Sequence, residues 1–223
     1  MPGHSSADRQ FGTVALLTIV CACTPSVASA DDAVYRVNTE ASRIYIRVDA
    51  DGSLGHNHGV EGLLSKGEIQ FGGAGQFVFN INSFVADTPS ARRFVGLDEK
   101  FSTSDARKVT ANMLGSDVLD AARYPTASFS MTSVKPLDNQ ASGQPGRYML
   151  DGQFLLHKMS RHLRIVAKVE PTQKPGLLHM QGQFTLLQSE YGIKPYSTFG
   201  GLVGVKDALT IWGDIYVSAP PGK

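Results

Sequence analysis

The sequence predicts an all-β fold, an antiparallel barrel of about eight strands with a helical insert. Three segments favour a barrel, because each alternates apolar and polar residues and carries a glycine at the centre of its apolar face. These glycines are Gly152, Gly182 and Gly213. Glycine within a strand marks a sharp bend or the close approach of a ligand, so we expect them to give curvature or to leave space inside. A two-sheet sandwich is the alternative architecture.

Nine segments show the alternation expected of strands, and connections between most of them are short. The segments are residues 34–37, 43–48, 67–71, 76–84, 126–134, 147–157, 161–170, 177–188 and 208–217. The glycine-rich stretch 72–75 predicts a hairpin turn, and residues 54–62, rich in glycine and histidine, are expected to interrupt the strands. Closure of such a sheet leaves no exposed edge, which favours the barrel.

Residues 87–119 differ from the rest of the chain and predict the helical insert. Ala106, Val109 and Met113 recur at helical spacing, and Ser104 is a candidate N-cap. We expect one helix or two short ones, lying outside the sheet or across one end of it.

Residues 1–30 have the features of a secretory signal peptide. Arg9 precedes an apolar run that begins at Phe11, and Ala28-Ser29-Ala30 supplies the small-x-small pattern of a cleavage site. We therefore expect cleavage after Ala30, export to the periplasm and a mature domain at residues 31–223. The apolar run is short for a membrane span of about 20 residues, and we expect no integral membrane segment in the mature chain. Lipid attachment at Cys21 or Cys23 is an alternative with a poor lipobox.

Composition narrows the possible functions of the mature domain. Both cysteines precede residue 31, so no disulfide is expected in residues 31–223. The whole chain carries 21 Lys and Arg against 20 Asp and Glu, without basic clusters. This balance argues against nucleic acid as a partner and against strong electrostatic docking to membranes. A homodimer remains open.

His56 and His58 form the one compact group of candidate metal ligands. Side chains two residues apart on extended backbone point the same way and could share zinc or copper, but no third ligand lies at a fixed spacing. A hydrolase has less support, since the mature chain lacks cysteine and a Gly-x-Ser-x-Gly motif. We expect a protein that is not an enzyme and needs no cofactor, with metal binding or an unrecognised hydrolase site as alternatives.

The apolar faces of the strands would converge inside a closed barrel. An eight-stranded barrel is either filled by side chains or holds one small ligand, and an apolar interior suits a hydrocarbon chain. The residues expected to line such a ligand pocket are Phe77, Phe79, Phe129, Met131, Leu150, Phe154, Phe184, Ile211 and Ile215. Tyr191 and Tyr196 are candidates for the gate of its entrance.

Several short pieces, in order along the chain, resemble the YceI-like family of exported lipid-binding proteins. They are residues 42–48, Gly55-His56-Asn57-His58, Val60-Glu61-Gly62, Asn112-Met113, Leu119-Asp120-Ala121-Ala122, Arg123-Tyr124-Pro125-Thr126-Ala127-Ser128-Phe129, residues 152–157 and residues 184–193. The resemblance covers the chain from Tyr35 to Val217.

The resemblance implies a lipocalin-like antiparallel barrel with a helical insert, and a pocket for a polyisoprenoid or another long-chain lipid in the periplasm. Many members carry a basic residue where this chain has Gln188, so no role of that base toward a ligand headgroup is carried over. The sequence thus predicts a periplasmic carrier of a long apolar chain.

Overall fold

The computed structural model describes residues 1, 3 and 33–219. Apart from positions 1 and 3, the signal peptide expected at residues 1–30 lies outside the described residues.

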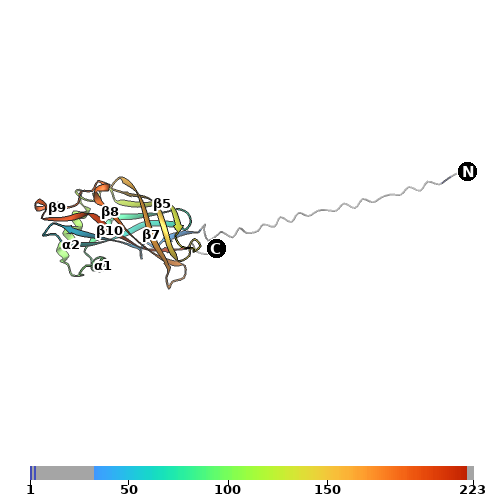
Figure 1. The fold of residues 1–223 in the computed structure, drawn as a ribbon, viewed down its shortest axis with the longest axis horizontal. Helices are drawn as coiled ribbons and strands as arrows, with labels where there is room; N and C mark the ends of the chain where they lie inside the picture. Colours follow the sequence, from blue (N-terminus) through green and yellow to red (C-terminus); the bar gives the residue numbers. More distant parts are fainter. Residues whose placement is uncertain (2, 4–32, 220–223) are drawn as a thin grey trace.

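Eight antiparallel strands close into a barrel, as the sequence predicted (Figure 1). Neighbours along the chain pair from β2 to β8, and β10 closes the barrel by pairing with both β2 and β8. The strands are β2 (Arg43–Asp51), β3 (His58–Gln70), β4 (Gly75–Ala86), β5 (Thr126–Pro136), β6 (Gly146–Leu156), β7 (Met159–Pro171), β8 (Leu177–Leu187) and β10 (Val203–Ser218). Because closure pairs the strand edges with each other, the sandwich alternative is wrong.

Two short strands mark the two ends of the barrel. β1 (Val34–Val37) pairs with the end of β10 and with β3, while β9 (Ser197–Thr198) pairs with the start of β10. We call the end of the barrel at β1 the closed end and the end at β9 the open end. The 3-10 helices η2 (Gln188–Tyr191) and η3 (Phe199–Gly201) lie in the connection from β8 to β10, and Figure 1 shows β9 and the helical insert at the open end.

Large side chains fill the closed end. Phe71 and Tyr148 have no exposed surface, and their ring centroids lie 4.8 Å apart. The Tyr148 hydroxyl donates a hydrogen bond to the carbonyl oxygen of Gln144 at 2.7 Å, which satisfies its polar group. Tyr35 of β1 packs edge-on against Phe71 at 5.0 Å. Space for a ligand therefore has to come from the other end.

The insert between β4 and β5 contains two helices, α1 (Pro89–Phe94) and α2 (Thr103–Leu114). Ser102, not Ser104, caps α2: its hydroxyl accepts a hydrogen bond from the Asp105 amide at 3.4 Å. Choosing Ser104 was wrong because either serine suits an N-cap and the spacing of apolar residues does not fix the first turn. The hydroxyl of Thr110 accepts a hydrogen bond from the Ala86 amide at 3.0 Å, which ties α2 to β4.

The expected interruption at residues 54–62 is only partly present, because β3 begins at His58 and pairs with β2 from there. Glycine suits this part of the strand because other groups pack on it. A Cβ at Gly59 would lie 3.0 Å from the backbone of Ala91 in α1, and one at Gly62 would collide with the Phe84 ring. These glycines therefore admit close packing rather than ending the strand.

The three glycines that suggested a barrel serve different purposes. At Gly152 a Cβ would collide with the carbonyl oxygen of Ser130, beside a bulge in β5. Gly152 thus permits the close approach that bends the sheet. Gly182 and Gly213 face each other across β8 and β10 and line a small cavity. Curvature and space are both present, at different glycines.

Candidate functional site: an apolar cavity at the open end

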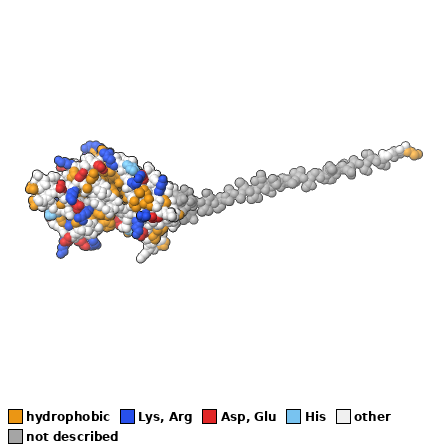
Figure 2. Space-filling view, in the orientation of Figure 1, with side chains coloured by type: hydrophobic (Ala, Val, Ile, Leu, Met, Phe, Trp, Pro, Cys, Tyr) orange, Lys and Arg blue, Asp and Glu red, His pale blue; other side chains and the backbone are white. Residues whose placement is uncertain are grey.

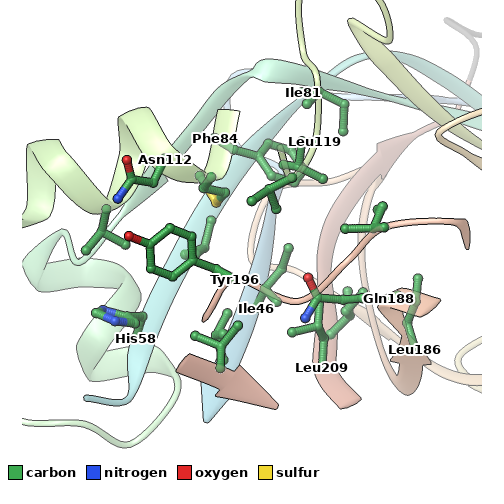
Figure 3. A pocket seen from close by; sticks show the side chains of 18 of the residues that line it. Ile46, His58, Ile81, Phe84, Asn112, Leu119, Leu186, Gln188, Tyr196 and Leu209 are labelled. Carbon is green, nitrogen blue, oxygen red and sulfur yellow. The ribbon is translucent and has the colours of Figure 1, made fainter. Parts of the chain in front are cut away.

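A cavity of about 450 Å³ occupies the open half of the barrel (Figure 3). Most of its walls are aliphatic and aromatic side chains from the strands, among them Ile46, Ile81, Leu186, Leu209 and Ile211. Its volume lies within the range of about 300–1,000 Å³ that is typical of small-molecule sites. The site is therefore a deep, largely apolar pocket.

The structure places the nine predicted pocket residues in three groups. Phe79, Phe154, Phe184 and Ile211 line the main cavity. A second cavity of about 50 Å³, deeper in the barrel, is lined by Phe77, Phe129, Leu150 and Ile215. Met131 lines neither cavity; it is buried, and its methyl group lies near Gly75. The alternation within each strand identified inward-facing residues, but not their height along the barrel axis.

Three phenylalanines separate the two cavities, since Phe79, Phe154 and Phe184 line both. The Phe154 ring is central: its centroid lies 6.2 Å from that of Phe79 and 5.9 Å from that of Phe184. Such tilted and edge-on arrangements are favourable for aromatic rings. We call these three residues the phenylalanine layer, and it forms the floor of the main cavity.

Helix α2 forms one wall of the cavity near its mouth, a contribution the sequence prediction missed. Val109 and Met113 present apolar side chains, while Asp105, Lys108 and Asn112 bring polar groups to the rim. None of the residues of α2 is fully buried, so the helix covers the cavity without being part of the barrel core. The helical spacing of Val109 and Met113 indicated an apolar face, but not what it covers.

Tyr196, His56, His58 and Gln188 complete the polar groups of the cavity lining. In Figure 3 the Tyr196 side chain reaches toward the side where His58 and Asn112 lie. The Gln188 side chain is buried and its amide donates a hydrogen bond to the carbonyl oxygen of Lys206 at 2.9 Å. The lining thus combines hydrocarbon walls with a few hydrogen-bonding groups.

Of the two tyrosines proposed as a gate, only Tyr196 lines the cavity. Tyr191 is buried in the core, with its ring edge-on to Phe154 at 5.8 Å between centroids. Burial raises the pKa of the Tyr191 hydroxyl above its ordinary value of 10.0. Tyr191 therefore supports the phenylalanine layer and does not lie at the mouth.

A buried ionic network holds His58 in the wall of the cavity. The His58 Nδ1 atom lies 2.6 Å from one carboxylate oxygen of Asp87, and Arg92 donates a hydrogen bond to the other oxygen at 2.7 Å. The side chains of His58, Asp87 and Arg92 are 13%, 0% and 9% exposed. The Gly59 amide also donates to Asp87, at 3.2 Å. The network joins β3, the end of β4 and α1 beside the pocket.

The partners of Asp87 favour the ionised form of its carboxyl group. Burial by itself would raise the pKa of Asp87, but hydrogen bonds from His58 and Arg92 outweigh it, so the pKa falls below the ordinary 3.8. Arg92 lies over the Phe101 ring, 4.8 Å from its centroid, and His58 packs edge-on against the same ring. Phe101 lines the cavity, so the network fixes part of its wall.

A metal site and a nucleophile in the main cavity would each require particular side chains among the described residues. No group of three or more His, Cys, Asp or Glu side chains in residues 33–219 is placed to hold a metal ion. His58, one of the two candidate ligands, has its Nδ1 atom engaged by Asp87. The described side chains that line the main cavity include no Ser, Thr or Cys that could act as a nucleophile.

The family model described as the YceI-like domain matches residues 35–216. The chain belongs to the YceI-like family. This confirms the resemblance inferred from the sequence. No curated protein matches the chain in a sequence comparison.

Solved structures share the fold of this YceI-like chain. A polyisoprenoid binding domain from Saccharophagus degradans, implicated in plant cell wall breakdown, has a TM-score of 0.58 at 13% identity, covering 83% of this chain and 98% of that one. BcnA of Burkholderia cenocepacia has a TM-score of 0.51 at 14% identity, covering 82% of this chain and 99% of its own. At these identities the likeness concerns the fold.

Proposed function

We propose that this protein binds one long apolar chain, from a polyisoprenoid or a fatty-acid-like lipid, inside the barrel and carries it in the periplasm. The observation that carries the proposal is the cavity of about 450 Å³ with hydrocarbon walls. Family membership supports a role in binding apolar ligands, and the solved domain from Saccharophagus degradans is described as polyisoprenoid binding. The signal peptide expected at residues 1–30 supports export.

The volume sets the length of chain that the cavity would hold. At roughly 30 Å³ per carbon-sized group, the share of one water molecule in the liquid, a cavity of about 450 Å³ accommodates roughly 15 chain carbons. Burying that many methylenes contributes about 12 kcal/mol before costs. Ordering the chain and losing its free motion subtract several kcal/mol. A micromolar or tighter complex follows from these magnitudes.

The uneven distribution of polar groups orients the ligand. Asp105, Lys108 and Asn112 on α2, with Tyr196 across from them, offer hydrogen bonds at the mouth. The phenylalanine layer at the floor offers none. The chain therefore enters tail first, and a polar headgroup stays near α2, where its hydrogen bonds are not lost.

A cavity-filling variant tests the proposal. Leu209 is half-buried and lines the main cavity. Leu209→Trp therefore puts a bulky indole ring where the lipid chain would lie. Val166 on the outer face of β7 is 46% exposed, and Val166→Trp is the matched control. The affinity for farnesol, measured by displacement of a fluorescent fatty acid, should fall about tenfold or more in Leu209→Trp, because at least two methylenes of the ligand lose their place in the cavity. Equal affinity in all three proteins, each shown to be folded, would contradict binding in this cavity.

A further inference from the structure

Three apolar side chains are unusually exposed at the open end of the barrel. Leu54, Phe199 and Leu202 are 61%, 77% and 51% exposed. Within residues 33–219 no other large hydrophobic side chain reaches these values; Val166 comes next at 46%. Single exposed apolar side chains are normal, but a group of them marks a surface that contacts something else.

These three residues form one surface, because the loops that carry them pack together. The Leu54 amide donates a hydrogen bond to the carbonyl oxygen of Leu202 at 3.0 Å, and the Leu202 amide donates to that of Phe199 at 3.4 Å. Gly52 lies so close to Leu202 that a Cβ would be 2.7 Å from its carbonyl oxygen. We call Leu54, Phe199 and Leu202 the apolar tip.

The apolar tip forms part of the rim of the cavity. Gly55 and His56, which follow Leu54, line the cavity, and so does Val203, which follows Leu202. β9, immediately before Phe199, lies at the open end in Figure 1. In Figure 2 hydrophobic side chains reach the surface at this end of the molecule. An apolar surface outside the protein is therefore continuous with the apolar cavity inside it.

The backbone at the tip is also unusual. Phe199 has a positive φ of 51°, and Gly200 and Gly201 follow with φ of 64° and 93°. The left-handed conformation is uncommon for a bulky residue that is not glycine. The Phe199 side chain is 77% exposed, so packing within this chain does little to offset the backbone strain.

We propose that the apolar tip inserts into the surface of a lipid bilayer, so that a chain passes between bilayer and cavity without crossing water. A bilayer fits because its hydrocarbon would meet the apolar rim directly. Residues 52–56 and 195–205 contain no Asp, Glu, Lys or Arg, and the charged residues that flank them, Asp51, Lys194 and Lys206, do not form a basic cluster. Insertion therefore depends on apolar contact and needs no anionic lipid. The purpose of the insertion rests on the proposed carrier function, but its test does not require a ligand.

Co-flotation with vesicles tests the insertion. Wild type is compared with Leu54→Ser/Phe199→Ser/Leu202→Ser, using phosphatidylcholine vesicles with and without added phosphatidylglycerol, at low and high salt. Leu137→Ser/Val166→Ser is the matched control, since both side chains are exposed by 45–46% and neither lines the cavity. Each tip substitution should weaken partition about tenfold, from the burial energy of one large apolar side chain.

Wild type and control should bind phosphatidylcholine vesicles equally at both salt concentrations, while the triple tip variant should bind about a thousandfold more weakly, since three tenfold effects multiply. Fluorescence gives a second readout: Phe199→Trp should shift to the blue on adding vesicles and Val166→Trp should not. Absence of wild-type binding, equal binding of the tip variant, or binding that needs phosphatidylglycerol and is released by salt would overturn the proposal. Displacement of fluorescent fatty acid without vesicles measures the cavity separately, so failure of the carrier function would be recognised as such.

Discussion

Removing the ring of Phe154 should lengthen the chain that the barrel accepts. Phe154 is the central member of the phenylalanine layer and contacts both cavities. In Phe154→Ala the main cavity of about 450 Å³ would join the deeper one of about 50 Å³ and gain the space of the ring. At roughly 30 Å³ per group, the deeper cavity and the lost ring together add room for roughly five carbons.

The expected change is a shift in the chain length at which affinity stops rising. Each methylene that enters the cavity contributes about 0.8 kcal/mol, which is close to a fourfold gain in affinity. For wild type the gain should end near 15 carbons, estimated from the cavity volume, and for Phe154→Ala it should continue to about 20 or more. Dissociation constants of a series of saturated fatty acids, measured by displacement of one fluorescent probe, give both end points.

Stability has to be measured alongside, because a buried Phe→Ala change costs about 3–5 kcal/mol of the 5–15 kcal/mol that a domain typically has. Phe154→Leu opens less space at a lower cost and serves if the alanine variant unfolds. Phe71→Leu is the control: Phe71 is fully buried at the closed end and lines neither cavity. Both leucine variants should be less stable, but only Phe154→Leu should accept longer chains. An unchanged end point in folded Phe154→Ala would refute the two-cavity description of the interior.

Three further results are expected. Asp87→Asn should lower the free energy of unfolding by about 3–5 kcal/mol in denaturant titrations, because Arg92 keeps its buried charge without a counterion. Asp151→Asn, at a surface ion pair with Arg164, should cost much less, because solvent screens exposed ion pairs. Equal losses in the two variants would argue against a buried network. The pKa of Asp87 is lowered in the folded state, so the stability that its carboxylate contributes is present above about pH 4 and is lost as the pH falls through the folded pKa. Wild type should therefore lose more stability than Asp87→Asn between about pH 5 and pH 2.5. Parallel curves of stability against pH for the two proteins would contradict this. In thermal unfolding, Gly152→Ala should be destabilised by about 1–3 kcal/mol through overpacking. Gly213→Ala should stay within about 0.5 kcal/mol of wild type, since a Cβ at Gly213 meets only the Ile215 side chain, at 3.5 Å. A larger loss for Gly213→Ala than for Gly152→Ala would contradict the roles of these glycines.

The barrel could be predicted from the sequence because its signal is local. Alternation within strands such as residues 161–170 fixes which side chains face inward, and turns between strands fix their antiparallel order. Position along the barrel axis is a different matter, since it depends on the register between strands. Met131 and Phe79 both face inward, yet Phe79 lines the main cavity and Met131 lies in solid core. Alternation alone does not separate them.

Most contacts at the mouth of the cavity could not be predicted from the sequence. Asp87 reaches His58 across 29 residues, and only closure of β3 against β4 brings the two together. His58 was singled out as a candidate metal ligand, whereas the structure gives it a carboxylate and an arginine as partners. The signal available in the sequence was Asp87 followed five residues later by Arg92 at the start of the helical insert. Without the barrel, that pair resembles any solvent-exposed ion pair.

Native mass spectrometry of the protein purified without detergent from the cells that make it, followed by organic extraction and lipid analysis, tests the proposed carrier function most directly. One additional mass per protein, extracted as a long apolar chain and lost from Leu209→Trp but kept by Val166→Trp, is the result expected from an apolar cavity of about 450 Å³. A bare protein mass that takes up no added prenyl lipid or fatty acid would contradict it.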